Sequence, residues 1–301
     1  MPRKNIVTLG VFDGIHRGHQ HLLQTVINRA KRRGAVPVVY TFNPHPAHIL
    51  VPKACPPMIM TMRQRLDFLK KLGIKKVVVQ KFTRRFARLS PESFFEKILQ
   101  KKLRASEIVI GYNFTFGYHR RGTAELLEKM GEERGVTVTV APPFLFGETL
   151  VSSTRIREFL RDSKIGEASD LLGHPYALTG TVVRGRGIGG KVLNLHTANL
   201  KPENDSILPI GVYATRTTIN EKKFDSVTNI GPNPTFGEGP VSLETHLFHF
   251  SKNIVGKKIQ VEFIKKIREE IRFPNPRELM AQIQKDIQTA KQCLQKNRHG
   301  K

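Results

Sequence analysis

The first half of the chain alternates short β-branched runs with helical patterns, and this alternation constrains the fold more than any other feature. Five runs are predicted as strands: residues 6–12, 36–42, 75–80, 107–110 and 136–140. Between the first two, apolar residues recur at helical spacing from Leu22 to Ala30, and the pattern stops at Gly34. Alternation of this kind predicts an α/β fold, a mostly parallel sheet with helices on both faces.

The pattern changes after about residue 172. Five strand-like runs follow with nothing helical between them, at residues 177–183, 211–218, 226–230, 241–250 and 258–264. This half is predicted to be an antiparallel barrel or a sandwich. A closing helix is marked by Asn275 as its cap, Pro276 in the first turn and Glu278 reaching back. We expect two domains, 1–172 and 173–301, with the boundary within residues 166–175.

A glycine turn joins the first predicted strand to a helix and carries two histidines, His16 and His19. Glycines at positions 10, 14 and 18 permit sharp turns and close approach of a ligand. A helix start presents unpaired N–H groups and favours anions. Because positions three apart share a helix face, both histidines are expected to donate to one phosphate group.

Two other interpretations of this stretch remain open. The histidines could simply cap or solvate the helix start, because short motifs often match by chance. Alternatively, His45 and His48 have the same spacing, and the four imidazoles could bind a metal. The glycine turn favours phosphate, since no cysteine or carboxylate cluster accompanies the histidines.

Three unusual loops follow predicted strands of the first half: the glycine turn, residues 41–46 and residues 111–117. Ligands of parallel sheets bind at the carboxyl ends of the strands. The three loops are therefore expected to converge on one edge of the sheet.

The formal net charge of +25 in 301 residues suggests binding to anions. The excess covers both halves, and clusters such as residues 31–33 fall near predicted helix ends, so we expect a generally basic surface. Nucleic acid is not expected as a partner, because Trp is absent and Tyr is scarce for base stacking. No apolar run is long enough for a membrane span, and two cysteines suit a reducing compartment, so a cytoplasmic protein is expected. Nothing in the sequence indicates an oligomeric state.

At this point the motifs coincide with those of a known family: the whole chain resembles the bacterial bifunctional riboflavin kinases/FAD synthetases. In the first half the resemblance is carried by residues 10–20, 41–46, 111–117 and 152–157, in the family's order. In the second half it is carried by residues 197–199, 211–214, 229–231 with 234–236, 244–246, and 268–270 with Phe273. It implies a Rossmann-like nucleotidyltransferase domain followed by a flavokinase barrel with a closing helix.

The resemblance implies two ATP-dependent steps, phosphorylation of riboflavin to FMN and adenylylation of FMN to FAD. Catalysis of adenylyl transfer consists mainly of aligning the reactants and neutralising their charge. His16 and His19 are the implied catalytic residues of this step. The implied nucleotide-binding residues of the first half are Gly10, Phe12, Asp13, Gly14, Ser152, Ser153, Thr154 and Arg157. Residues 152–157 are also expected to form a capped helix start. Pro44, His45 and Asn113 are expected to border the flavin, or to form only a rigid turn.

The kinase step benefits from a general base, because a hydroxyl must lose its proton. The resemblance implies Glu244 as that base; a structural salt bridge is the alternative for a carboxylate in an apolar strand pattern. It also implies Thr197 and Asn199 as ligands of Mg²⁺, Gly185 and Gly189 in a glycine-rich nucleotide loop, and Arg268 at the flavin.

The chain departs from the family at residues 194–196, where Asn-Leu-His replaces the usual Gly-Phe-Pro before Thr197. Losing both glycine and proline changes how rigidly Thr197 and Asn199 are presented. Two alternatives therefore stand beside the bifunctional enzyme: an FMN adenylyltransferase with a weak or inactive barrel, and a basic nucleic-acid-binding protein on a nucleotide-binding fold.

Overall fold

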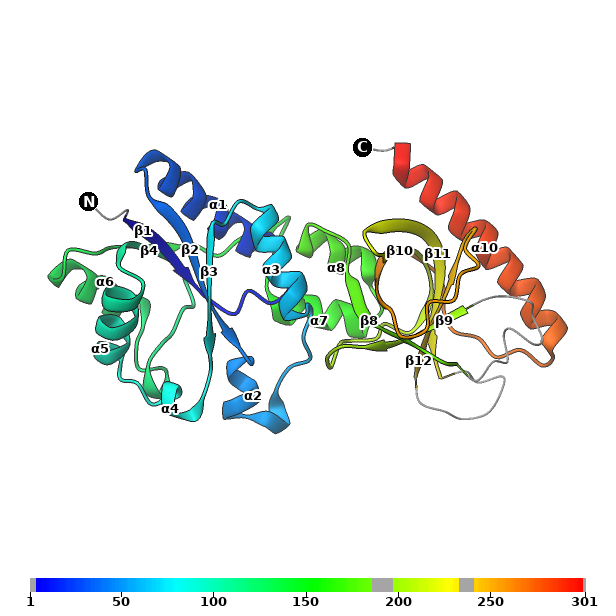
Figure 1. Ribbon diagram of the computed structural model, residues 1–301, viewed down its shortest axis with the longest axis horizontal. Helices are drawn as coiled ribbons and strands as arrows, with labels where there is room; N and C mark the ends of the chain where they lie inside the picture. The colour runs from blue at the N-terminus through cyan, green and yellow to red at the C-terminus, as the bar shows by residue number, and fades with distance from the viewer. Residues whose placement is uncertain (1–3, 186–196, 233–240, 300–301) are drawn as a thin grey trace. The chain divides into compact units, whose positions relative to one another are not determined.

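The computed structural model describes residues 4–185, 197–232 and 241–299 (Figure 1). The chain forms two compact units. One comprises Met1–Pro56 and Met62–Ser152, and the other Pro57–Thr61 and Ser153–Lys301. The short segment Pro57–Thr61 and the stretch after Ser153 thus pack with the second unit, while the functional boundary at residue 172 stays a prediction.

The first unit contains a five-stranded parallel sheet in the order β3-β2-β1-β4-β5. Its strands are β1 (Asn5–Leu9), β2 (Val36–Asn43), β3 (Lys76–Lys81), β4 (Ala105–Gly111) and β5 (Thr137–Ala141). The parallel α/β prediction is confirmed. The first strand was predicted to reach residue 12 but ends at Leu9, because the chain turns at Phe12, whose φ is +54°.

Helices cover both faces of this sheet (Figure 1). The segments of the unit are α1 (Arg17–Arg32), α2 (Pro46–Leu50), η1 (Pro52–Ala54), α3 (Met62–Lys71), α4 (Arg84–Ala87), α5 (Pro91–Phe94), the π-helical η2 (Phe95–Lys102), η3 (Tyr118–Arg120), α6 (Ala124–Glu133) and the hairpin β6 (Leu145–Phe146) with β7 (Thr149–Leu150). On one face, α5, η2 and α6 pack on apolar side chains of the central strands, among them Val7, Tyr40 and Ile108. On the other, Leu23 and Val26 of α1 are fully buried.

A buried carboxylate fixes α1 to the sheet. Glu107 on β4 is 0% exposed and pairs with Arg29 and, at 2.9 Å, with Arg33, both at the end of α1. Such a carboxylate is tolerated in a core only with its partners, because an unpaired buried charge is costly. The helix that begins at the glycine turn is therefore held to the sheet at its carboxyl end.

The second unit is built around a closed six-stranded antiparallel barrel in the order β10-β11-β12-β9-β8-β13, so the barrel alternative is correct and the sandwich is not. Its strands are β8 (Ala177–Val183), β9 (Thr197–Pro202), β10 (Gly211–Ile219), β11 (Lys222–Gly231), β12 (Ser242–Leu247) and β13 (Lys258–Arg268). Strand β9 was not predicted. Strand β12 ends at Leu247 instead of residue 250, because the chain turns at His249, whose φ is +55°.

The barrel interior is partly polar. Five fully buried hydroxyl residues form a hydrogen-bonded ladder with oxygen separations of 2.8–2.9 Å: Thr215, Thr217, Ser226, Thr228 and Thr245. Buried hydroxyls are stable where they satisfy one another. The ladder therefore identifies the inner face of β10, β11 and β12.

Three helices complete the unit: α7 (Ser153–Arg161), α8 (Ile165–Leu172) and α10 (Pro276–His299). Helix α10 begins as predicted, because Asn275 accepts from the Glu278 amide at 3.0 Å and donates to its carboxylate at 2.9 Å. It packs outside the barrel, where Ala290 and Leu294 contact Val212 and Val227.

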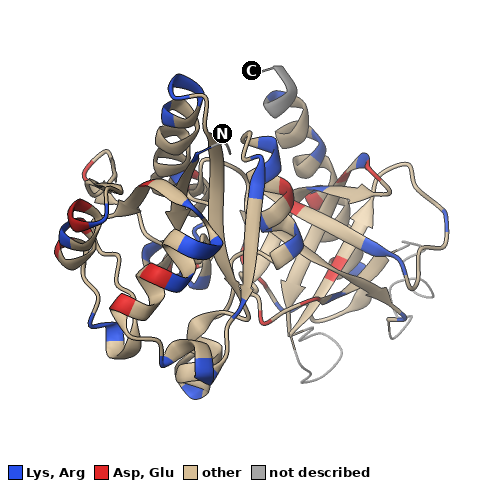
Figure 2. Ribbon diagram, turned by 60° about the vertical axis from the view of Figure 1, so that its left-hand side comes forward, with Lys and Arg blue, Asp and Glu red and all other residues tan. Residues whose placement is uncertain are grey.

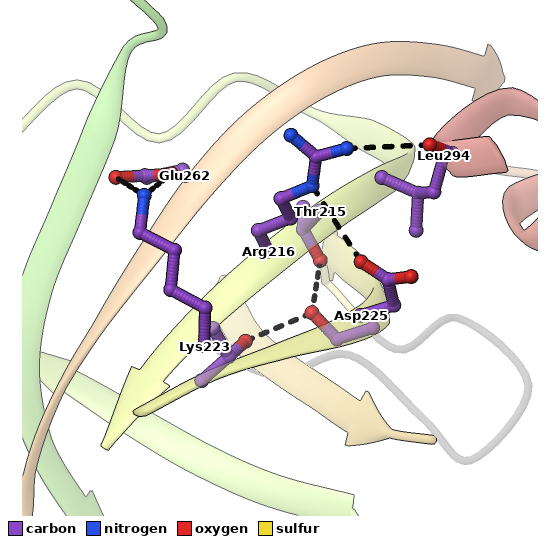
Figure 3. A network of polar contacts seen from close by, with 8 residues as sticks. Thr215, Arg216, Lys223, Asp225, Glu262 and Leu294 are labelled. Carbon is purple, nitrogen blue, oxygen red and sulfur yellow. Dashed lines mark hydrogen bonds and ion pairs between the residues drawn. The ribbon is translucent and has the colours of Figure 1, made fainter. Parts of the chain in front are cut away.

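Polar contacts on the outer face of the barrel join its strands, and one of them also holds α10 (Figure 3). Arg216 donates to the Leu294 carbonyl oxygen at 3.2 Å and pairs with Asp225 at 3.5 Å, while Lys223 bridges to Glu262 at 2.9 Å.

Candidate active sites

The glycine turn after β1 is anchored by its apolar side chains. Phe12 and Ile15 are 1% and 0% exposed although both have positive φ. This inward anchoring turns the intervening backbone, and Gly14 lies between them with a φ of +81°. Residues with positive φ are strained unless packing holds them, so the burial of Phe12 and Ile15 fixes the backbone conformation of this turn.

The two histidines of this turn lie face to face. His16 caps α1, with its Nδ1 accepting from the His19 amide at 3.3 Å, and the two rings stack with centroids 3.6 Å apart. His16 therefore caps the helix, as one of the interpretations expected. This does not conflict with a phosphate site, because a capped N-terminus is itself an anion site.

The charge of His19 follows from its surroundings. Burial, the neighbouring His16 and the nearby Arg65 lower the pKa of His19 well below its usual value of 6.5. His19 is therefore neutral near pH 7 and offers a hydrogen bond, not a fixed charge. Its Nδ1 is buried without a hydrogen-bond partner in the described part of the chain.

Arg65 is a residue of this region that the sequence analysis missed. It lies on α3, is 3% exposed, and its Nη1 donates to the Val11 carbonyl oxygen at 2.6 Å. The available signal was its place on the buried stripe of α3, four residues before Leu69, where an apolar residue is normally expected.

The other two loops lie where predicted, at the carboxyl ends of β2 and β4, and both strands flank β1. Thr41 donates to the Val11 carbonyl oxygen at 3.2 Å. Pro44 follows a cis peptide bond, and His45 caps α2 by accepting from the Ala47 amide at 3.0 Å. Asn113 is exposed on the loop after β4. His45 thus caps a helix start, and the flavin contact of Pro44, His45 and Asn113 stays a prediction.

The residues 152–157 divide between the two units. Ser152 ends the first unit, and Ser153, Thr154 and Arg157 belong to α7 in the second. Arg157 is 6% exposed, and its Nε donates to the Pro57 carbonyl oxygen at 2.8 Å. A grip on the triphosphate by these side chains together with the histidines therefore stays a prediction.

The predicted kinase residues come together on the outside of the barrel. Asn199, Glu244 and Asn229 are register partners across β9, β12 and β11. The adjacent row is Thr197, His246 and Val227, and Val227 packs against α10. Because alternate residues of a strand share a face, both rows lie on the outer face of the barrel.

The end of β8 approaches this row closely. A Cβ built at Gly185 would lie 2.2 Å from Nδ2 of Asn199, so a larger residue there would have to displace the Asn199 side chain. The first residue of the predicted glycine-rich loop therefore lies against Asn199. Gly189 and residues 194–196 lie outside the described residues.

Arg268 is engaged by α10. Its Nε and Nη2 bind the Asp286 carboxylate at 2.8–3.1 Å, and Asp286 is 4% exposed. A bidentate pair of this kind orients the guanidinium firmly. The pair joins the end of β13 to α10. The flavin contact of Arg268 remains a prediction.

Glu270 lies in a stretch that carries the family resemblance, but the sequence analysis gave it no role; in the structure it lies beside Asn229 and Glu244. It receives a hydrogen bond from Asn229 and packs so tightly on Gly231 that a Cβ there would lie 2.6 Å from its carboxyl carbon. Burial raises the pKa of Glu270, and Glu244 adds to the rise. One of its oxygens is buried without a partner among the described residues.

The donor set on this face suits Mg²⁺. The Thr197 hydroxyl and the Asn199 amide oxygen are hard oxygen ligands from one strand, with the Glu244 carboxylate on the next. Mg²⁺ prefers such oxygens and usually completes its shell with water and substrate phosphates. No cluster of three or more His, Cys, Asp or Glu side chains is placed to hold a metal within the described ranges, so the four-imidazole alternative finds no support there.

Basic side chains are spread over the helices and strands of both units (Figure 2), as their distribution along the sequence predicted. None of the helices in the described segments is both long and apolar enough to cross a membrane.

Comparison with known proteins identifies both halves. The family model of FAD synthetase matches residues 1–155, and that of riboflavin kinase matches residues 172–294. The bifunctional riboflavin kinase/FMN adenylyltransferase of Escherichia coli K12 is 37% identical over 95% of this chain and 92% of its own length. That of Bacillus subtilis 168 is 34% identical over the same shares.

A crystal structure described as a macrolide-efflux protein from Streptococcus pneumoniae shares the fold over 97% of this chain and 95% of its own, with a TM-score of 0.84 and 30% identity. With both family models matched in order and the relatives aligned nearly end to end, the chain belongs to the bifunctional riboflavin kinase/FMN adenylyltransferases.

Proposed function

We propose that the two activities of the family are carried in this chain by two separate sets of residues. The outer face of the barrel phosphorylates riboflavin to FMN, and the glycine turn of the first unit adenylylates FMN to FAD, with ATP as co-substrate in both steps. The observation that carries the proposal is the register pairing of Glu244 on β12 with Asn199 on β9 and with Asn229 on β11, which gathers polar side chains on the outer face of the barrel.

In the kinase step, Glu244 accepts the proton of the ribityl hydroxyl as that oxygen attacks the γ-phosphorus of ATP, and ADP leaves. Thr197 and Asn199 would hold Mg²⁺, which supplies charge neutralisation at the phosphates when it is bound. Asn199 is held between the chain at Gly185 and its register partner Glu244. This arrangement links the metal ligands to the base through one strand pair.

In the adenylyl-transfer step, a phosphate oxygen of FMN attacks the α-phosphorus of ATP, and pyrophosphate leaves. The attacking oxygen is already ionised, so no base is needed. His16, His19 and the N–H groups at the start of α1 bind phosphate oxygens, and Gly10, Phe12, Asp13 and Gly14 shape the turn. Ser152, Ser153, Thr154 and Arg157 are further nucleotide-binding residues, as the resemblance implies, and Pro44, His45, Asn113 and Arg268 are flavin-binding residues.

The test is to incubate the purified chain with riboflavin or FMN, ATP and Mg²⁺ and to resolve the flavins by chromatography. FMN from riboflavin and FAD from FMN support the proposal. FAD from FMN without FMN from riboflavin supports an adenylyltransferase with an inactive barrel, the alternative that residues 194–196 keep open. Product from neither substrate, together with steeply salt-dependent nucleic-acid binding, would favour the nucleic-acid hypothesis.

A further inference from the structure

The first unit buries one arginine in a way that its own helix does not explain. Arg65 is 3% exposed, whereas the side chain of Arg63 on the same helix is 81% exposed and meets Asp67 only at 4.0 Å. Arg65 reaches the turn through the Val11 carbonyl oxygen, which also accepts from Thr41. The burial of Arg65 is therefore specific to its place beside the glycine turn.

The guanidinium of Arg65 has an unused donor. Its Nε is buried and has no hydrogen-bond partner among the residues that the structure describes. Burial lowers the pKa of Arg65, and the nearby Asp13 opposes that effect. A buried cationic donor without a partner is costly, so a ligand that supplies the missing acceptor gains affinity. Guanidinium groups favour phosphate oxygens.

Because His19 is neutral, the positive charge of Arg65 is needed to bind a triphosphate at this turn. His19 is neutral near pH 7, in part because Arg65 lies close to it. The helix start contributes only the partial charge of its N–H groups. A triphosphate bound at this turn therefore requires a permanent cation, and in this part of the unit Arg65 is within electrostatic reach of both Asp13 and His19.

We propose that Arg65 is a further nucleotide-binding residue of the adenylyl-transfer site, whose Nε donates to a phosphate oxygen of ATP and whose charge offsets the triphosphate beside a neutral His19. This inference rests on the proposed function and deepens it. In this assignment the positive charge of the ATP site comes from Arg65 on α3, and the histidines supply further hydrogen bonds to the phosphates.

The test compares Arg65→Gln and Arg65→Lys with Arg63→Gln, in steady-state assays of both activities. Losing a charge-assisted hydrogen bond is expected to raise KM for ATP in adenylyl transfer about 10- to 100-fold in Arg65→Gln. Arg65→Lys is expected to recover part of the loss, because it keeps the charge. KM for FMN and the riboflavin kinase activity stay unchanged, and Arg63→Gln behaves as the wild type.

Three outcomes would overturn the inference: an unchanged KM for ATP in Arg65→Gln, an effect confined to KM for FMN, or equal losses in the glutamine and lysine variants. A readout without turnover comes from the ring resonances of His19, identified by their loss in His19→Gln. ATP should shift them in the wild type at concentrations that leave Arg65→Gln unchanged. If ATP shifts them in neither protein, the proposed adenylyl-transfer site itself fails; if it shifts both equally, only the role of Arg65 fails.

Discussion

Asn199 on β9 and Glu244 on β12 are register partners on the outer face of the barrel, although 44 residues separate them in the chain. Thr197 lies two residues from Asn199 and therefore shares that face. The predicted metal ligands and the predicted base are thus brought together by strand pairing, on the side of the wall opposite the hydroxyl ladder.

Glu244→Gln tests the base directly. The amide keeps the shape and hydrogen bonding but cannot take a proton, so riboflavin phosphorylation should fall about 10²- to 10⁴-fold while FMN adenylylation is spared. His19→Ala should give the reverse pattern. Both are measured as initial rates with riboflavin or FMN as the substrate. Equal loss of both steps in either variant would show that the two sites are misassigned.

Gly231→Ala tests the packing of Glu270. The new Cβ would lie 2.6 Å from the Glu270 carboxyl carbon and must displace it, so kinase activity should fall. Gly166→Ala is the matched control, because nothing lies within 4 Å of its added Cβ. If displacement of Glu270 is the cause, Gly231→Ala should cost little in a Glu270→Ala background, and additive losses would contradict the explanation.

Thr228→Val tests the hydroxyl ladder. Thr228 bonds Thr215 at 2.8 Å and Thr245 at 2.9 Å inside the barrel, so its loss should lower the free energy of unfolding by about 1–3 kcal/mol. In Thr218→Val, the hydroxyl removed is buried and has no partner in the described segments, so the change should be within about 0.5 kcal/mol or stabilising. The stability of both variants is measured as the urea concentration at which half of the kinase activity is lost. Similar midpoints for the two variants would mean that the ladder contributes nothing.

The lowered pKa of His19 predicts acid sensitivity. In the unfolded chain this histidine takes up a proton near pH 6.5, whereas the folded protein resists protonation until a lower pH. The unfolded state therefore binds more protons in that window, and stability should decline as the pH falls below about 6.5. Urea unfolding followed by circular dichroism at pH 7.5 and 5.5 should show a smaller decline for His19→Gln than for the wild type. His21→Gln, at an exposed position on the same helix, is the control, and an equal decline in all three proteins would contradict the assignment.

The amino-acid sequence by itself determined the parts of this protein that depend on local order. Strand and helix periodicity predicted the parallel sheet of the first unit, and the capping pattern of Asn275 and Glu278 predicted the start of α10. The order of the motifs predicted the family. These features are readable because hydrophobic periodicity and capping act between residues close together in the chain.

The tertiary structure decided what depends on distant pairing and burial. Closure into a barrel, the pairing of the unpredicted β9 with β12, and the outer-face row arise from contacts between strands far apart in sequence. Arg65 looks like an ordinary surface charge in the sequence, the burial of Glu270 is not visible in its motif, and Arg268 gives no sign of its pairing with Asp286. Burial of a charge is a property of the packed neighbours around it, so only the assembled fold distinguishes these residues from the many exposed charges of a strongly basic chain.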